Sequence, residues 1–288
     1  MFKYLKNKFP LPAFLLIPCL LLLVSCGPER MIGSYYVKNS AKGSILLIRP
    51  GFIYKNNHMR LDLSDQMSEA EKDSVSFYRS SYLQYISDSA FIEDYMNSFI
   101  DRLLSAGFDV YAQESRDSFK LAGPPAYIIN VAQLQMEESR DTTGSESLSG
   151  MEGEGSNYPS GLSLNTLRLS SWFEFTELNP DSANVKKLFF ASSVARDAVK
   201  SGLNLMPESG EPGFQLHIDT LTMNDVYDLA RQSGRKYGDY LVDYLMNEFI
   251  RLQMPNGMVP QLYMHYDPEL RRVRNSNGEG FQELEPGK

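Results

Sequence analysis

Apolar residues recur at helical spacing in two long segments of the chain. The clearer segment runs from about Ser89 to Leu104 and repeats large apolar side chains in an i, i+1, i+4, i+5 rhythm, which makes one broad apolar stripe. Gly107 is placed to cap its end. The second segment runs from about Asn224 to Leu252, where Gly234 and Gly238 are expected to weaken the helix midway. Both segments predict helices that pack against a core.

A further helix and several strands are predicted by local signals. Ser68-Glu69-Ala70-Glu71 has the form of a capping box and predicts a helix that continues to about Tyr85. Short apolar or alternating runs predict strands over residues 45–48, 108–112, 127–136, 167–178, 185–192, 214–218 and 261–266. Within 127–136, we expect Ile128, Leu134 and Met136 on one face, and Ile129 and Val131 on the other.

Grouped helices between runs of strands predict an α+β fold, in which helices pack on an antiparallel or mixed sheet. We expect one ectodomain over residues 43–268, with a mobile loop over 139–163, where serine, glycine and glutamate dominate. Residues 26–42 have little periodicity and are expected to form a lipid anchor and tether. Residues 269–288 are expected to form a flexible tail.

The start of the chain has the layout of a secretory signal peptide. Three lysines, Lys3, Lys6 and Lys8, precede a nearly unbroken apolar stretch over residues 11–25. This stretch is shorter than the ~20 residues of a membrane-spanning helix, and prolines interrupt it. We therefore predict that residues 1–25 are a cleaved signal peptide.

The end of this stretch reads Leu23-Val24-Ser25-Cys26, which resembles the lipobox of bacterial lipoproteins. The resemblance covers the signal peptide and Cys26. It implies a diacylglycerol thioether on Cys26, cleavage just before it, and acylation of the new amine with a palmitate-type chain. Two or three acyl chains on one residue anchor a protein stably. Gly27, which is not aspartate, implies the outer membrane by the enterobacterial sorting rule; the face exposed there, periplasmic or exterior, stays open.

The cysteines and the charge narrow the possible functions. Cys19 is lost with the signal peptide and Cys26 is lipidated, so the mature domain has no free thiol and is neither a thiol enzyme nor a cysteine-ligated metalloprotein. The whole chain carries −8, and removal of three signal lysines leaves −11. A chain this acidic is unsuited to nucleic acid. The predicted partners are the membrane, reached through Cys26, and an envelope protein.

Three histidines are the natural candidates for a metal site. His217 and His265 each precede an aspartate by two residues, in His217-Ile218-Asp219 and His265-Tyr266-Asp267, while His58 stands apart. Two such pairs would form a zinc site only if their strands were adjacent. Ordinary strand residues are the better interpretation, and we predict no metal and no cofactor.

The remaining candidates are acidic and aromatic. Glu137, Glu138 and Glu174 are candidates for carboxylate catalysis on a glycan, but no spacing selects a pair. Tyr35, Tyr36, Trp172 and Phe173 could contribute to a binding surface, although Trp172 or Phe173 is expected in the core.

Other motifs are weaker still. A serine-hydrolase elbow is missing. The glycines at 150, 153 and 155 do not fit a phosphate loop. A calcium-loop frame from Asn275 fails at Pro286.

These features predict a membrane-anchored lipoprotein of the bacterial cell envelope, acting as a non-enzymatic accessory or scaffold protein. The alternatives are a lipoprotein that binds a glycan, peptide or lipid, and a carboxylate-based cell-wall or glycan hydrolase. If the protein is such a hydrolase, we expect two acidic groups that face each other in a cleft. If it binds a ligand, we expect a defined pocket.

Overall fold

The computed structural model describes residues 27–39, 42–59, 66–143, 162–179, 183–205, 212–255 and 258–285. The predicted signal peptide, Cys26 and most of the predicted loop 139–163 lie outside these residues, as do the glycines at 150, 153 and 155. Among the described helices, none is long and apolar enough to cross a membrane.

The chain divides into two compact units. Unit 1 comprises residues 1–41 and 242–279, and unit 2 comprises residues 42–241 and 280–288. Their elements, in chain order, are α2 Pro28–Asn39, β1 Ser44–Ile48, β2 Ile53–Asn57, α3 Glu69–Tyr78, η1 Leu83–Tyr85, α4 Asp88–Ser105, β3 Asp109–Ala112, η2 Gln113–Ser115, α5 Arg116–Leu121, β4 Ala126–Thr143, β5 Leu162–Leu178, β6 Val185–Arg196, β7 Ala198–Leu205, β8 Pro212–Asp219, α6 Met223–Gln253, β9 Met264–Asp267, β10 Arg272–Asn275 and β11 Gln282–Leu284.

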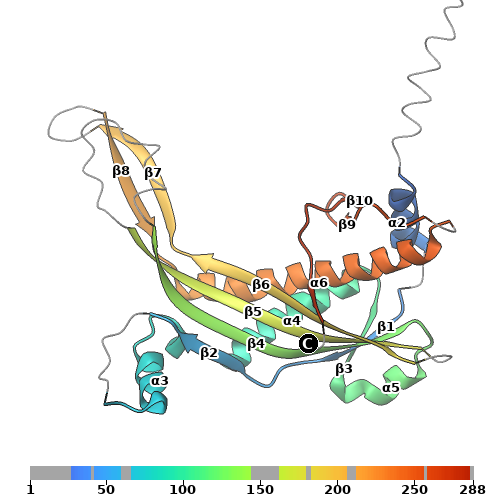
Figure 1. Ribbon diagram of the computed structural model, residues 1–288, viewed down its shortest axis with the longest axis horizontal. Helices are drawn as coiled ribbons and strands as arrows, with labels where there is room; N and C mark the ends of the chain where they lie inside the picture. The colour runs from blue at the N-terminus through green and yellow to red at the C-terminus, as the bar shows by residue number, and fades with distance from the viewer. Residues whose placement is uncertain are drawn as a thin grey trace, which may run out of the picture. The chain divides into compact units, whose positions relative to one another are not determined.

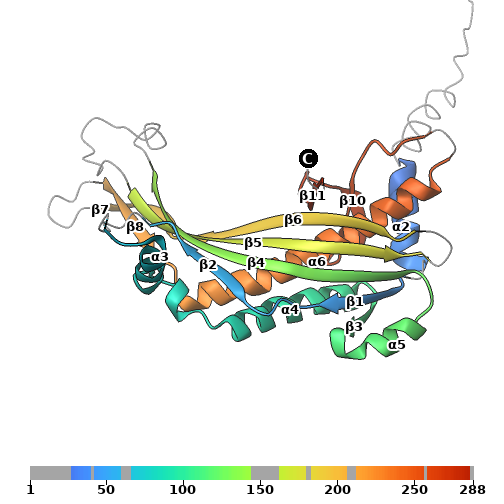
Figure 2. The same ribbon diagram turned by 60° about the horizontal axis from the view of Figure 1, so that its bottom comes forward.

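Unit 2 is built on a mixed sheet with the strand order β11-β6-β5-β4-β1-β3, and β2 also pairs with β4. The long strand β5 runs antiparallel to both of its neighbours, β4 and β6, whereas β1 and β2 run parallel to β4. Helices α4 and α6 cover one face of this sheet (Figures 1 and 2). The predicted α+β class, with helices packed on a mixed sheet, is confirmed.

The core of unit 2 lies between the sheet and these two helices. Most of the predicted apolar stripe of α4 is buried, and Phe91, Tyr95, Phe99 and Leu103 have essentially no exposed surface, whereas Leu104 at its end is 51% exposed. The Phe99 ring lies 6.1 Å from that of Phe173 on β5, so the helix packs directly on the sheet. Phe173 is therefore the core aromatic, while its neighbour Trp172 faces the other side of β5 and contacts Phe190.

The expected alternation along β4 is wrong because the strand contains a bulge. The register against β5 shifts between Val131 and Gln133. An extra residue at a bulge reverses which side chains face the core. Ile129 and Val131 are consequently buried together with Leu134 and Met136, instead of facing away from them.

Gly234 and Gly238 have a packing role in α6. A Cβ on Gly234 would collide with the carbonyl oxygen of Tyr95, and one on Gly238 would lie 2.8 Å from Arg102 Cβ. The helix is continuous through both glycines. The sequence predicted that the two glycines weaken α6 midway. Their effect is instead to let the backbones of α4 and α6 approach closely.

Unit 1 is formed by α2, the last part of α6 and the β9-β10 hairpin. Gly33 and Tyr36 on α2 are buried, and a Cβ on Gly33 would lie 3.2 Å from both Ile250 and Val273. The Tyr36 ring lies 5.1 Å from that of Phe249 on α6.

The domain boundaries drawn from the sequence differ from this arrangement. Residues 28–39 of the predicted tether form α2, whose buried side chains belong to unit 1. The predicted tail 269–288 contains β10, which pairs with β9, and β11, which pairs with β6. Instead of one ectodomain over 43–268, the chain forms two units that each use distant segments.

Candidate functional site

Unit 2 has an open cleft of about 740 Å³ where β6 passes into β7 beside the start of α6. Its apolar lining includes the buried Leu164 and Leu229 and the partly exposed Val194. Two carboxylates, Asp225 and Asp228, add a polar side. The lining therefore suits a ligand with both apolar and polar parts.

A buried carboxylate fixes the wall of this cleft. Asp197 lies between β6 and β7 and accepts hydrogen bonds from the Asn165 backbone and side chain, at 2.8 and 2.9 Å, and from the Leu221 backbone at 2.8 Å. The Leu221 carbonyl in turn accepts a hydrogen bond from the Tyr82 hydroxyl. Burial, together with the nearby charge of Asp197, raises the pKa of Tyr82. Asp197 thus holds three segments in place.

The carboxylates of the cleft are also occupied locally. Asp225 accepts hydrogen bonds from the backbone and hydroxyl of Thr222, both at 2.7 Å, and so caps the start of α6. These bonds lower the pKa of Asp225. Asp228 forms an ion pair with Arg231. Both carboxylates are thus engaged with groups at the start of α6.

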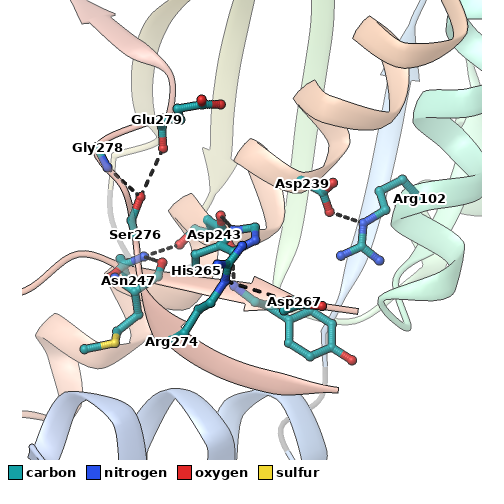
Figure 3. Close-up of polar contacts among 12 residues, drawn as sticks. Arg102, Asp239, Asp243, Asn247, His265, Asp267, Arg274, Ser276, Gly278 and Glu279 are labelled. Carbon is teal, nitrogen blue, oxygen red and sulfur yellow. Dashed lines mark hydrogen bonds and ion pairs between the residues drawn. The ribbon is translucent and has the colours of Figure 1, made fainter. Parts of the chain in front are cut away.

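Unit 1 contains a polar cluster around a buried aspartate of α6 (Figure 3). Asp243 is 2% exposed. Its Oδ2 atom lies 2.6 Å from His265 Nδ1, and its Oδ1 atom accepts a hydrogen bond from the Tyr266 backbone at 2.8 Å. On the same helix, Asn247 donates to the Met264 carbonyl and accepts from the Met264 N–H. Together, Asp243 and Asn247 attach strand β9 to the helix.

A partly buried ion pair lies within unit 2, between the buried Arg102 on α4 and Asp239 on α6 (Figure 3). Arg102 also donates to the Ser105 hydroxyl, which is bonded back to the Arg102 carbonyl. The pair joins the two helices at the turn where Gly238 allows their close approach.

The predicted histidine pairs do not combine into one site. His217 pairs with Asp219 on the exposed β7-β8 hairpin, at 3.0 Å, as the strand alternation predicts. His265 instead contacts Asp243, while Asp267 lies near Arg274. Strand β8 pairs with β7 and β9 pairs with β10, so the two strands are not neighbours. Across the described ranges, no group of three or more histidine, cysteine, aspartate or glutamate side chains could hold a metal ion.

The predicted carboxylate candidates have separate partners. Glu138 is fully buried and accepts hydrogen bonds from the backbones of Ser81, Tyr82 and Leu83, at 2.7 to 3.2 Å. Glu137 points to the opposite face of β4, where His58 and Arg168 lie within 4.0 Å. Glu174 is exposed and accepts a hydrogen bond from Asn130. These three carboxylates do not face one another across a cleft.

The predicted aromatic candidates are also separated. Tyr36 and Phe173 are core residues, whereas Tyr35 is 56% exposed on α2. Sequence reasoning missed Asp243 and Asp197 altogether. The sequence did contain a sign that Asp243 has a special role. This aspartate interrupts a run of apolar residues on α6, on the side of the helix that is buried. Asp197 offered no such signal.

The sequence matches no known protein family and no curated protein. Among the solved structures that the comparison matched is a putative neuraminyllactose-binding hemagglutinin homolog from Helicobacter pylori, with 8% identity over 75% of this chain and 97% of that one, at a TM-score of 0.31. A score this low does not establish a common fold.

Proposed function

We propose that the protein is a bacterial lipoprotein, held at the outer membrane by acyl chains on Cys26, and that it acts as a non-enzymatic accessory protein by binding an envelope partner. The observation that carries the proposal is the position of α2. This helix begins at Pro28, two residues after the lipobox cysteine, and buries Glu29, Gly33 and Tyr36 in unit 1. A folded unit therefore starts two residues after the cysteine that the lipid would hold.

The arrangement of the acidic residues supports binding over catalysis. Glu138 accepts three hydrogen bonds from backbone N–H groups, Asp197 accepts two from the backbone and one from the Asn165 side chain, and Asp225 caps a helix. A hydrolase of the carboxylate type needs two acidic groups facing one substrate bond, about 5 to 10 Å apart. The candidate carboxylates Glu137, Glu138 and Glu174 instead have separate partners and do not face one another.

The lipid anchor is tested by metabolic labelling with an alkyne analogue of palmitate in a bacterium that processes lipoproteins. Label should attach to the wild-type chain and disappear in Cys26→Ala. Cys19→Ala is the matched control and should keep the label, because Cys19 lies within the signal peptide. A wild-type chain without label would refute the anchor.

The partner is tested by crosslinking in intact cells with photoreactive groups on unit 2, followed by mass spectrometry. We expect one recurrent envelope protein in the crosslinked product. If only the uncrosslinked monomer is found at every linker length, the accessory role is contradicted, whereas the proposed lipid anchor is unaffected.

The cleft of unit 2 favours a second candidate function, binding of a small glycan, peptide or lipid. Its volume of about 740 Å³ lies in the range of small-molecule sites. The test is a thermal-shift screen with oligosaccharides, short peptides and fatty acids. A ligand of the cleft should lose its effect in Val194→Glu and keep it in Val185→Glu, because both valines are similarly exposed on β6 but only Val194 lines the cleft.

A further inference from the structure

Exposed apolar side chains are concentrated in unit 1. Its described residues are about a fifth of the described chain, yet they hold eight of the eighteen large apolar side chains that are exposed there: Met31, Tyr35, Leu252, Met258, Val259, Leu262, Tyr263 and Leu270. Val259 is 79% exposed and Met258 is 59% exposed. Single exposed apolar residues are common, but a local concentration marks an interaction surface.

Three of these side chains lie in the short segment 258–262, which we name the apolar loop. The Gln261 N–H of this loop donates a hydrogen bond of 3.2 Å to Glu29 Oε1. Glu29 is buried in the first turn of α2. The segment after α6 passes the first turn of α2 in both views (Figures 1 and 2). The apolar loop is therefore held against the start of α2.

This position brings the apolar loop close to the predicted lipid. Glu29 is three residues after Cys26, and three residues span at most about 11 Å. Met31, 64% exposed, lies on the same first turns of α2. Acyl chains on Cys26 would therefore enter the bilayer beside Met258, Val259 and Leu262.

The negative charge of the chain lies in unit 2, and unit 1 is neutral. Residues 26–41 and 242–279 together contain six basic side chains (lysine and arginine) and six acidic ones (aspartate and glutamate), so their net charge is zero. The whole charge of −11 on the mature chain therefore belongs to unit 2. Anionic headgroups repel acidic surfaces, so unit 1 is the part of the chain that can approach them without that cost.

We infer that the apolar loop is a second membrane contact, which inserts Met258, Val259 and Leu262 into the headgroup region beside the lipidated Cys26. This rests on the proposed lipid anchor. Apolar side chains at an interface add to the binding that acyl chains supply. With two neighbouring points of attachment, unit 1 would lie on the bilayer surface in a fixed orientation.

The test uses the lipoprotein purified from membranes and placed in vesicles of phosphatidylethanolamine and phosphatidylglycerol. Val259→Cys supplies the single reactive thiol, because Cys19 leaves with the signal peptide and Cys26 carries lipid. The environment-sensitive fluorophore NBD is attached to it. Leu121→Cys is the matched control, because Leu121 is 89% exposed on α5 of unit 2.

We expect blue-shifted NBD emission at position 259 and quenching by shallow spin-labelled lipids at least about twofold stronger than at position 121. A blue shift without lipid quenching would mean that protein covers the loop, either a partner or a second copy, and would overturn the inference. Equal quenching at both positions would also overturn it.

The two proposals fail in different ways. Water-like emission at position 259 on protein that floats with the vesicles overturns the loop contact and leaves the lipid anchor standing. Protein that does not float at all overturns the anchor, and the loop contact with it.

Discussion

His265 Nδ1 lies 2.6 Å from the Oδ2 atom of Asp243, a carboxylate that is almost completely buried. The other oxygen of Asp243 accepts the Tyr266 N–H. One side chain on α6 thus holds two consecutive residues of β9.

Replacing Asp243 should therefore destabilise unit 1. Asp243→Ala leaves the Tyr266 N–H and the His265 ring without their buried acceptor, and we expect a loss of about 3 kcal/mol in the free energy of unfolding. Glu248→Ala on the same helix is the control. It removes only a surface pair with Arg251, so its cost should stay below about 1 kcal/mol. Urea denaturation of both variants makes the comparison, and equal losses would contradict the assigned role.

The same substitution should have very different costs at two neighbouring glutamates. Glu138→Gln keeps one acceptor oxygen but brings an NH₂ group toward three backbone donors, and we expect a cost of about 3 kcal/mol. Glu137→Gln should cost less than about 0.5 kcal/mol, because Glu137 lies on the solvent side of β4. Thermal unfolding followed by circular dichroism measures both. A catalytic role would instead require these residues to affect activity without affecting stability.

Gly234→Ala should destabilise unit 2, although alanine normally favours a helix over glycine by about 1 kcal/mol. The added methyl group meets the Tyr95 carbonyl oxygen of α4, so the helices must separate. We expect a loss of about 3 kcal/mol. Gly123→Ala is the control, since no atom lies within 4 Å of its Cβ position. A stabilised Gly234→Ala variant would show that the two helices do not approach as described.

Lys42 should make stability depend on pH in the alkaline range. Burial lowers the pKa of its ammonium group from 10.5 to about 8. Between these values the unfolded chain binds more protons than the folded chain, so the free energy of unfolding rises with pH over this interval. Chemical denaturation at several pH values should show a smaller rise in Lys42→Met than in the wild type. Identical pH slopes would contradict a depressed pKa.

The elements that the sequence predicted well are those whose signal is local. Helix α4 has an uninterrupted apolar stripe, and the capping box at Ser68 and Glu71 forms as predicted. Helix α2 was missed because its buried positions are Glu29, Gly33 and Tyr36, which make no apolar stripe. Strand β11 is three residues long, and its partner on β6 lies about ninety positions earlier, so no local pattern marks it.

The candidate sites were harder to predict for a related reason. A single inserted residue near Ala132 reverses the faces of β4, and alternation alone contains no sign of it. Asp197 and Asp243 acquire their roles from Leu221 and His265, which are 24 and 22 residues away along the chain. Only the folded chain brings these groups together.

The interleaving of the two units has a consequence for folding during synthesis. Helix α2 is the first described element of the chain, but Ile250 and Val273, against which it packs, come more than 200 residues later. The edge strand β11 follows later still and completes the sheet of unit 2. Neither unit can therefore finish folding while the chain is still emerging, and a nonsense mutation after Leu241 would damage both units at once.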